Sequence, residues 1–470
     1  MKKYFFRAAL IFSPLFICFV GPWPISDTHY LEMDYAKSTL HHIDKLTPVH
    51  HTGQLTGAVS VVDITPPVGV ELAGYSARAP KSNEGVLHKV YVKAISLSDG
   101  NNLITFVSPE ILLPMPQLVD NIIKTTGLNR NEVFFAATHT HSGPGAYAKG
   151  FISEMALGNY NQEQFKFLSE KISNAIIESR KNLVAVEAKY RRIHLTEEYA
   201  NQFIKDQLNT PPQPHNIIQL LELHELASDS RMAALFTFSA HPTFLGRRNK
   251  MVSGDYPGVV MQALEQQFQG AMIFASGAAG GMLPIGENNS ANLNADEQFE
   301  KMHDMSQRFI QLFSGFLKKP AIYDDQKIQH VEQWDTSQTT LQSEFIPVEL
   351  PNASYRLNDH LRLSPLLVQQ IFHNDKSYIQ AFRLGNIIFL GYPADYSGEL
   401  ARNLEHWAGE RNIYPWATSF NGDYIGYIMP THHYDKSHYT VRSVNFYGRW
   451  AGDYFTDISQ RTINKLYSNE

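Results

Sequence analysis

Residues 133–145 read VFFAATHTHSGPG, an apolar strand candidate that ends in two histidines and a turn of Ser, Gly and Pro. Residues two apart on a strand face the same side, so His139 and His141 can project together from its end. The Ser-Gly-Pro-Gly run that follows stops the strand and leaves backbone N–H groups free. This stretch therefore predicts a strand whose carboxyl end presents two imidazoles to a shared site.

Two later apolar runs end in side chains that can also bind a metal. LFTFSAHP at 235–242 contains His241 at its end, and IIFLGYPAD at 387–395 ends in Asp395. In open α/β sheets, ligands collect beyond the carboxyl ends of the strands. Two imidazoles, a carboxylate and an open position for water make up a catalytic zinc set. The pattern predicts that His139, His241 and Asp395 converge on one metal ion.

Each of these side chains also has a structural explanation. A histidine at a strand end is often held by hydrogen bonds as part of the fold, and Asp395 can cap a helix over 396–408. The segment 419–447 contains five tyrosines, from Tyr424 to Tyr447, and three histidines. Tyrosine can ligate a metal or donate its O–H to an oxyanion, but a half-buried, Tyr-rich loop wall explains the same density. The residues alone leave both interpretations open.

Strand and helix patterns alternate from about residue 57 onward. Runs of apolar or alternating residues indicate strands, and apolar residues at helical spacing indicate helices. The alternation predicts an α/β fold of mixed β-sheets flanked by helices, in one large domain over 56–470, with a β excursion or small lid over 327–365. The strand candidates are 57–65, 90–98, 102–108, 133–140, 186–195, 216–224, 232–240, 271–276 and 378–392, and the helix candidates are 116–126, 162–180, 256–268, 296–318 and 395–408.

Residues 1–24, MKKYFFRAALIFSPLFICFVGPWP, have the anatomy of an export signal. Basic residues precede a short apolar stretch, which Gly21-Pro22 ends. We expect export to the periplasm or the cell exterior, with the segment either removed or kept as a membrane anchor. An apolar helix packed on the domain is the alternative. Residues 25–55 are polar and histidine-rich, and they predict a tether.

The composition excludes several classes of protein. Of the 470 residues, 43% are apolar and 18% are charged, which suits a sizeable core and excludes a disordered chain. A net charge of −6 offers no basic field for nucleic acid. No apolar run of about 18 residues or more follows the N-terminus, which excludes a polytopic membrane protein. Because Cys18 is the one cysteine, disulfides, zinc–thiolate sites and cysteine nucleophiles are excluded downstream.

From about residue 57 to 450, the motifs and their order resemble the neutral/alkaline (non-lysosomal) ceramidases. The shared strings are DITP at 63–66, LAGY at 72–75, THTHSGPG at 138–145, AHPT at 240–243, SGD at 253–255 with Gly258, and GYI at 426–428 followed by Tyr439. The resemblance implies an α/β catalytic domain with one Zn²⁺ ion per chain. The implied zinc ligands are His139, His241, Asp395 and Tyr427. His141 is implied to act as the acid/base group, and Tyr439 to polarise the scissile carbonyl.

The resemblance also implies an activity, the hydrolysis of the amide bond of N-acyl sphingoid lipids to fatty acid and sphingosine. Water activated by the metal would attack the carbonyl directly, and His141 would pass the water's proton to the leaving nitrogen. Asp255 is expected to orient His241 or His141, as carboxylates beside ligating imidazoles commonly do. The implied partner is a lipid-like small molecule, with peripheral membrane contact and no nucleic acid.

Several departures from the family pattern bear on the substrate. Asp395 stands where the family has Glu, which shortens the ligating arm by one methylene. Leu283 stands where the family has a catalytic Ser, which excludes a serine nucleophile there. The family's Arg in an NRS tripeptide has no clear counterpart near 200–203, and we expect no C-terminal immunoglobulin-like domain. These changes leave two alternatives: a zinc amidase or esterase acting on another acylated amphiphile, and an inactive, metal-retaining lipid-binding relative.

Overall fold

Two β-sheets lie at the centre of the structure, a computed structural model that describes residues 16–78, 81–286, 294–318, 327–371 and 376–468. The larger sheet has nine strands in the order β13-β11-β10-β8-β3-β5-β6-β7, with β15 also paired to β8, and the smaller has the order β17-β19-β20-β22. The strands of the larger sheet are β3 (Thr56–Asp63), β5 (Tyr91–Ser98), β6 (Leu103–Pro109), β7 (Val133–Phe135), β8 (Val184–Leu195), β10 (Ile217–Glu225), β11 (Arg231–Phe238), β13 (Ala271–Ser276) and β15 (Ile328–Thr336). Those of the smaller sheet are β17 (Leu341–Glu349), β19 (Lys376–Leu384), β20 (Ile387–Gly391) and β22 (Tyr414–Thr418).

The two sheets pack face to face through a shared aromatic core. Phe106 and Phe134 of the larger sheet lie in one buried cluster with Phe389 and Trp416 of the smaller sheet. The ring of Phe389 lies 5.7 Å from Phe106, 6.1 Å from Phe134 and 4.6 Å from Trp416, between centroids. Pairs at these separations add to the free energy already gained by burying their apolar area. The packing fixes the position of the smaller sheet, and with it Asp395, relative to the larger sheet.

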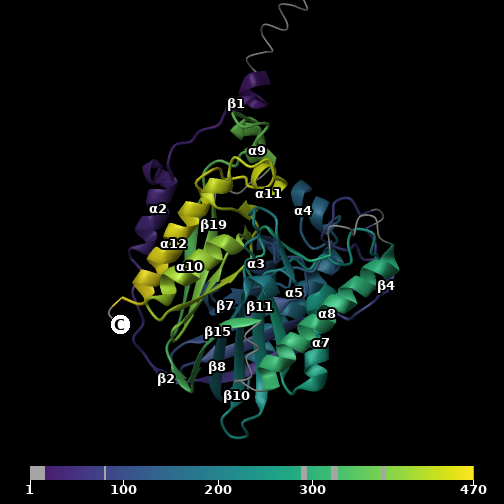
Figure 1. The fold of residues 1–470 in the computed structure, drawn as a ribbon, viewed down its shortest axis with the longest axis vertical. Helices are drawn as coiled ribbons and strands as arrows, with labels where there is room; N and C mark the ends of the chain where they lie inside the picture. The colour runs from purple at the N-terminus through teal and green to yellow at the C-terminus, as the bar shows by residue number, and fades with distance from the viewer. Residues whose placement is uncertain (1–15, 79–80, 287–293, 319–326, 372–375, 469–470) are drawn as a thin grey trace, which may run out of the picture.

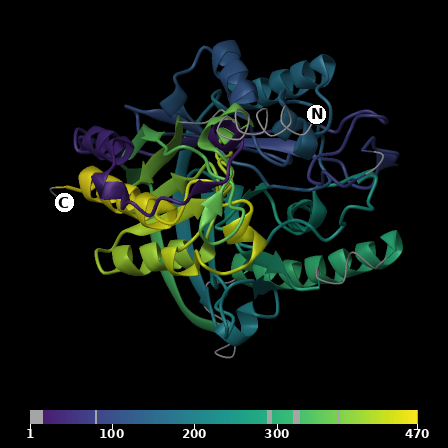
Figure 2. The same cartoon turned by 90° about the horizontal axis from the view of Figure 1, so that it is seen from above.

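Helices cover the outer face of each sheet. Apolar faces of α3 (Pro116–Thr126), α5 (Gln162–Ser179), α7 (Asp255–Gln267) and α8 (Ala295–Lys318) bury against the larger sheet. Those of α2 (Asp34–Ile43), α10 (Gly398–Gly409) and α12 (Ala451–Leu466) bury against the smaller sheet. Figure 1 shows α7 and α8 on one side of the molecule and α2, α10 and α12 on the other, and Figure 2 shows the same groups from above. The predicted α/β class, with mixed sheets flanked by helices in one domain, is confirmed.

Local sequence sets the limits of the predicted helices. In α3, Pro116 occupies the first turn, where a missing N–H costs nothing, and Gly127 follows the last turn with a φ of +70°. In α5, Asn161 accepts hydrogen bonds from the N–H groups of Glu163 and Gln164, and this capping stabilises the first turn. These helices lie where the spacing of apolar residues predicts them.

Two expectations about segments are corrected by the structure. Residues 25–55 are not a tether, because Ala36, Leu40 and Ile43 of α2 are buried in the core beneath the smaller sheet. The segment 327–365 is rich in strands, as predicted, but β15 and β17 extend the two sheets instead of forming a lid. Of the predicted export signal, residues 1–15 lie outside the described residues. Within the part of the chain that the structure describes, no helix has the length and apolar composition needed to cross a membrane.

Candidate metal centre

His139 and His141 come together beyond the end of β7. They do not belong to the strand itself, which was predicted to extend to residue 140. β7 ends at Phe135, and the chain continues beside β6 through hydrogen bonds such as Thr138 N to Pro109 O at 3.2 Å. His139 then adopts a left-handed φ of +63°. This turn brings the Nε2 atoms of the two imidazoles to 3.2 Å from each other.

His241 and Asp395 complete the group. His241 follows β11, and Asp395 opens the short strand β21 (Asp395–Tyr396) after the end of β20. Oδ1 of Asp395 lies 2.9 Å from Nε2 of His241. Ligand atoms of His139, His241 and Asp395 all lie within 4.8 Å of one another, and all three residues are buried. The structure thus brings together the three side chains that the strand-end pattern singles out.

Backbone carbonyls fix the orientation of both buried imidazoles. Nδ1 of His139 lies 2.7 Å from the carbonyl oxygen of Leu112, and Nδ1 of His241 lies 3.1 Å from that of Met282. Because a carbonyl oxygen can only accept, the proton of each neutral ring is on Nδ1. The Nε2 lone pair of each ring is therefore left available to a ligand.

The Nε2 lone pair of His241 faces another acceptor, and this arrangement fits a metal ion. Nε2 of His241 lies 2.9 Å from a carboxylate oxygen of Asp395, and Nε2 of His139 lies 3.2 Å from Nε2 of His141. The His241–Asp395 pair repels unless a proton or a cation lies between the two atoms. Burial, followed by the nearby His141, lowers the pKa of His139 well below its usual range, which disfavours an extra proton. Two imidazoles and a carboxylate are a donor set suited to zinc.

The Tyr-rich segment supplies two contacts that sequence reasoning missed. The ring of Phe420 stacks on that of His139, with centroids 3.5 Å apart and planes 4° from parallel. The hydroxyl of Tyr424 donates to Oδ2 of Asp395 at 2.7 Å. The high number of tyrosines in 419–447 marks this segment in the sequence, but it does not identify Phe420 and Tyr424 as the residues that contact the site. They orient a histidine and a carboxylate of the candidate centre.

Tyr427 and Tyr439 lie next to this group. β21 pairs in parallel with β23 (Tyr427–Ile428), which sets Tyr427 opposite Asp395 in register. Burial, together with Asp395 and Tyr439, raises the pKa of Tyr427 well above its ordinary value, and the rings of Tyr427 and Tyr439 meet edge to face with centroids 6.2 Å apart. Tyr439 begins α11 (Tyr439–Arg442) and is 46% exposed. Tyr427 therefore lies on the buried side of the site and Tyr439 on the solvent side.

His141 is held beside the centre by its neighbours. Its carbonyl oxygen accepts from the buried guanidinium of Arg78 at 2.7 Å, and its ring lies 4.9 Å from that of Tyr75. Gly74, with a φ of +112°, approaches so closely that a Cβ there would lie 2.6 Å from Cβ of His141. Burial, then His241 and Arg78, lowers the pKa of His141 well below its usual range. The imidazole is thus neutral and able to accept a proton.

Asp255 has a different role from the one expected. Its carboxylate accepts from the backbone N–H groups of Leu245 at 3.1 Å and Tyr256 at 2.7 Å. Leu245 lies in the turn that follows His241, so Asp255 holds that turn against the start of α7. The expected contact with an imidazole is replaced by contacts with backbone amides, which a buried carboxylate needs to offset its desolvation.

Left-handed backbone conformations are concentrated here. His139, Ala146, Asp255 and Phe420 have φ values of 63°, 61°, 54° and 64°. Residues with side chains adopt this region at a cost that the surrounding structure must offset, and they cluster at functional sites. The strain coincides with the residues that surround the candidate centre.

The stretch with Leu283 lies beside His241. β14 (Met282–Pro284) pairs with β9 (Ile204–Asp206), and the carbonyl that holds His241 belongs to Met282. Leu283 pairs with Lys205 in this small sheet. Leu283 is therefore one residue away from a contact that orients His241.

Two other His/Glu groups have simpler explanations. In the first, Glu332 already pairs with Arg192 and with His194. In the second, Glu399 lies 2.9 Å from Nε2 of His433. Nδ1 of His433 has no partner among the described residues, so Nε2 can carry the proton and donate it. Neither group contains the opposed lone pairs seen between His241 and Asp395.

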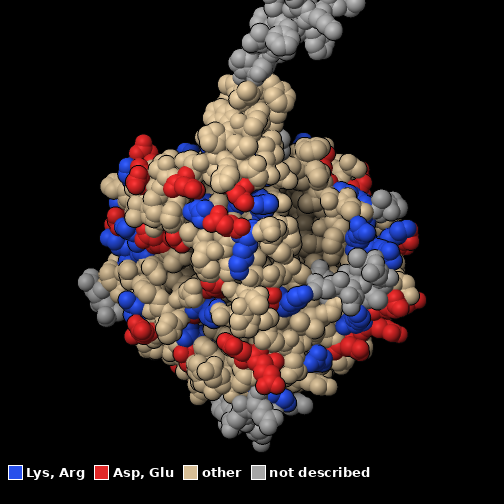
Figure 3. Space-filling model, turned by 45° about the horizontal axis from the view of Figure 1, so that its top comes forward, with Lys and Arg blue, Asp and Glu red and all other residues tan. Residues whose placement is uncertain are grey.

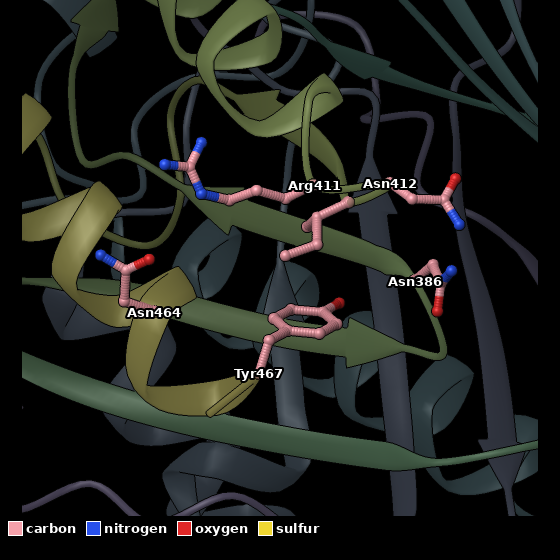
Figure 4. Close-up of a pocket in the computed structure, with 6 residues that line it drawn as sticks. Asn386, Arg411, Asn412, Asn464 and Tyr467 are labelled. Atoms are coloured by element: carbon pink, nitrogen blue, oxygen red, sulfur yellow. The ribbon is translucent and has the colours of Figure 1, made fainter. Parts of the chain in front are cut away.

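A surface cavity of about 340 Å³, drawn in Figure 4, is distant from the candidate centre. Its lining comes from the residues just before β20 and β22 and from the end of α12: Asn386, Arg411, Asn412, Ile413, Asn464 and Tyr467. Asp395 follows the opposite end of β20. The cavity therefore belongs to the other end of the smaller sheet.

Glu110 gives a prediction about pH and stability. It follows β6, is 2% exposed, accepts from Tyr91 N at 3.1 Å through Oε1, and has no partner for Oε2 among the described residues. Burial raises its pKa from 4.5 to about 7. Below about pH 4.5 the carboxyl is protonated in both the folded and the unfolded chain. As the pH rises from there to 7, only the unfolded chain loses the proton, so the free energy of unfolding falls. The raised pKa of Glu110 corresponds to a loss of about 3 kcal/mol in the free energy of unfolding.

We expect Glu110→Gln to remove this loss. Its free energy of unfolding in urea, relative to the native chain, should rise between pH 5 and pH 8 by up to about 3 kcal/mol. Glu178→Gln, which changes an exposed carboxyl of α5, is the control and should leave the pH dependence unchanged. If the free energy of unfolding changes with pH in the same way for Glu110→Gln and the native chain, the prediction is contradicted.

Comparison with known proteins agrees with the fold and the motifs. Residues 56–315, more than half of the chain, match the N-terminal domain of the neutral/alkaline non-lysosomal ceramidases. The chain is 22% identical over 218 residues to neutral ceramidase of Oryza sativa subsp. japonica, covering 43% of this chain and 28% of that protein. It is 20% identical over 189 residues to neutral ceramidase of Mycobacterium tuberculosis, covering 37% and 29%. The chain thus spans under a third of the length of these curated relatives.

Solved structures of ceramidases share the fold. Neutral ceramidase from Pseudomonas aeruginosa superposes with a TM-score of 0.69 at 16% identity, covering 88% of this chain and 74% of that one. A ceramidase complexed with C2 superposes with a TM-score of 0.70 at 16% identity, covering 87% and 75%. With the sequence match over 56–315, the chain belongs to the neutral/alkaline non-lysosomal ceramidase family.

Proposed function

We propose that this protein is a zinc-dependent amidohydrolase whose substrate is ceramide, an N-acyl sphingoid lipid. The observation that carries the proposal is the convergence of His139, His241 and Asp395, whose ligand atoms lie within 4.8 Å of one another in a buried site. Membership of the ceramidase family supports the reaction class. A ceramidase of this fold has been solved in complex with C2, which supports a lipid substrate.

The residues that would hold zinc are His139, His241 and Asp395, with Tyr427 beside them. When bound there, zinc supplies an activated water and polarises the amide carbonyl. The protein fixes the donors in advance: Phe420 stacks on His139, and Tyr424 bonds the second oxygen of Asp395. Such outer contacts set the orientation of the ligands and typically change metal affinity by about 10–100-fold. The 2.9 Å between Oδ1 of Asp395 and Nε2 of His241 supports Asp395 as a ligand despite its shorter arm.

His141 is the group that would move the proton. Its neutral ring accepts a proton from the attacking water and returns it to the leaving nitrogen of the amide. Arg78 and Gly74 hold it in position from behind. Since water attacks the carbonyl directly, the reaction needs no serine, and Leu283 is compatible with hydrolysis.

The test combines zinc content with product release. The purified full chain, loaded with zinc, should contain about one zinc per chain and release fatty acid from ceramide. Release from other acyl amides or esters, with ceramide untouched, would favour hydrolysis of another acylated amphiphile. Zinc binding without turnover of any substrate would favour the inactive lipid-binding alternative, and absence of zinc after loading would overturn the proposal.

Tyr439→Phe tests the proposed oxyanion donor. Tyr439 lies on the solvent side of the site, with its ring against that of Tyr427, so its hydroxyl is placed to reach a substrate carbonyl without ligating the metal. We expect kcat to fall by about 10²- to 10³-fold, the usual cost of losing one such donor, with zinc content unchanged. Tyr355→Phe, at another exposed tyrosine, is the matched control. Unchanged kcat in Tyr439→Phe would contradict this role.

A further inference from the structure

A cluster of polar side chains is buried between α10 and strands of the larger sheet. Charged side chains of this protein are common at its surface, as the Lys, Arg, Asp and Glu groups spread over one face in Figure 3 show. Glu405 of α10 differs, since only 2% of it is exposed, and His215, Gln219 and Ser239 around it are buried as well. Burying a carboxylate costs free energy, so hydrogen bonds must offset that cost at Glu405.

Every polar side-chain atom of this cluster has a partner. Nε2 of His215 lies 3.1 Å from one carboxylate oxygen of Glu405, and Nδ1 of His215 lies 2.8 Å from the hydroxyl oxygen of Ser239. The second carboxylate oxygen of Glu405 accepts from Nε2 of Gln219 at 3.0 Å. Oε1 of Gln219 in turn accepts from the hydroxyl of Tyr190 at 2.6 Å. A buried network in which every member is bonded holds its elements rigidly at one spacing.

The serine, histidine and glutamate of the cluster do not form a second hydrolytic site. In a catalytic triad, Nε2 of the histidine faces the serine and Nδ1 faces the acid. Here the two ring nitrogens are exchanged, because Nδ1 of His215 faces Ser239 and Nε2 faces Glu405. Ser239 is also buried, so a substrate has no access to its hydroxyl. The arrangement therefore points to a role in holding segments of the chain together.

The cluster connects the two segments that carry His241 and Asp395. Ser239 follows β11 and precedes His241 by two residues. Asp395 precedes the first residue of α10 by three residues, and Glu405 lies on that helix. The bonds from Glu405 through His215 to Ser239 thus set the spacing between the strand end that presents His241 and the helix that follows Asp395.

The first turn of α10 lies directly against the same groups. A Cβ on Gly398 would lie 2.9 Å from Cβ of His215 and 2.8 Å from Cε of Met282. Met282 is the residue whose carbonyl oxygen lies 3.1 Å from Nδ1 of His241. The start of α10 therefore contacts both the cluster and the residue that orients His241.

Direct attraction does not hold the two candidate ligands together before a metal binds. Nε2 of His241 and Oδ1 of Asp395 are both acceptors, 2.9 Å apart. We propose that Glu405 is a positioning residue of the metal centre. Through His215 and Ser239, it holds the segments of His241 and Asp395 at the spacing that a shared metal ion needs. The inference rests on the proposed function, because it concerns the same zinc site.

Zinc affinity of the purified full chain, measured by competition with a chromophoric chelator, tests this role. We expect Glu405→Ala to bind zinc about 10- to 100-fold more weakly, the usual effect of losing a group that supports metal ligands. Ser239→Ala deletes one hydroxyl at the other end of the connection and should also weaken zinc binding. Adding Ser239→Ala to Glu405→Ala should cause no further loss, because both changes break the same connection.

Glu405→Gln tests whether hydrogen bonding is sufficient for the role. The amide oxygen can accept from Gln219, and the amide nitrogen can donate to Nε2 of His215 if the ring proton moves to Nδ1. Nδ1 then donates to the hydroxyl oxygen of Ser239. We therefore expect Glu405→Gln to keep the native zinc affinity.

Thr237→Val is the matched control. Oγ1 of Thr237 in β11 accepts from Nε1 of Trp416 in β22 at 2.8 Å, a buried hydrogen bond that joins the two sheets. Thr237→Val should lower the free energy of unfolding in urea and leave zinc affinity unchanged. The control thus separates a loss of stability from a loss of ligand position.

The outcomes distinguish this role from the proposed function. Native zinc affinity in Glu405→Ala would overturn the positioning role alone; if Glu405→Ala does not fold, native affinity in Ser239→Ala would overturn it. An equal loss of affinity in Thr237→Val would make the effect one of general stability and would also overturn it. If the native chain binds no zinc, the proposed function fails, and the positioning role fails with it.

Discussion

We expect His241→Ala to lose its zinc and to hydrolyse ceramide about 10³-fold or more slowly than the native chain. The imidazole is buried, its Nδ1 is bound to the carbonyl of Met282, and its Nε2 faces Asp395 at 2.9 Å. Removing it takes away one of three convergent donors and leaves a buried carboxylate without its neighbour. Loss of a Lewis acid costs several kcal/mol of transition-state stabilisation, and about 4 kcal/mol is a factor of 10³.

The measurement is elemental analysis of zinc beside fatty-acid release, on protein whose far-UV circular dichroism matches that of the native chain. His330→Ala is the matched control, because His330 belongs to a different His/Glu group. It should retain zinc and activity. Zinc retained in His241→Ala but lost in His330→Ala would place the metal at the other group.

The sequence predicts those residues of the site whose positions can be inferred from the pattern of a single segment. His139, His241 and Asp395 each end an apolar run, and the rule that strand ends share an edge is sufficient to bring them together. Phe420 and Tyr424 could not be found in this way. Their contacts with His139 and Asp395 depend on how a loop after β22 folds back between the two sheets, and no local pattern encodes that path.

Similar reasons explain the errors in the fold. In α2 only Ala36, Leu40 and Ile43 provide a buried apolar stripe, and polar residues between them hide the helical period. Asp255 was expected beside an imidazole because carboxylates commonly support ligating histidines. Instead, its carboxylate accepts from the backbone amides of Leu245, in the turn after His241, and of Tyr256. Contacts with backbone groups leave no trace in side-chain patterns.

We expect His141→Ala to keep its zinc and to lower kcat by about 10²- to 10⁴-fold, with KM little changed. General acid/base groups contribute rate enhancements of this size. His141 is less buried than His139 and His241, and its Nε2 lies 3.2 Å from Nε2 of His139, so it can act on a water held at the centre. A fall in kcat at constant KM would show that the lost interaction belongs to the chemical step.

Adding free imidazole tests the assignment further. If His141 transfers the proton, imidazole should restore part of the rate of His141→Ala, because the truncated side chain leaves room beside Tyr75 and Gly74. Imidazole should not restore His241→Ala, which lacks the metal. Two results would contradict the role: a native rate in His141→Ala would mean that another group moves the proton, and loss of zinc would make His141 a ligand. The short distance between the two Nε2 atoms makes zinc content the deciding measurement between ligand and base.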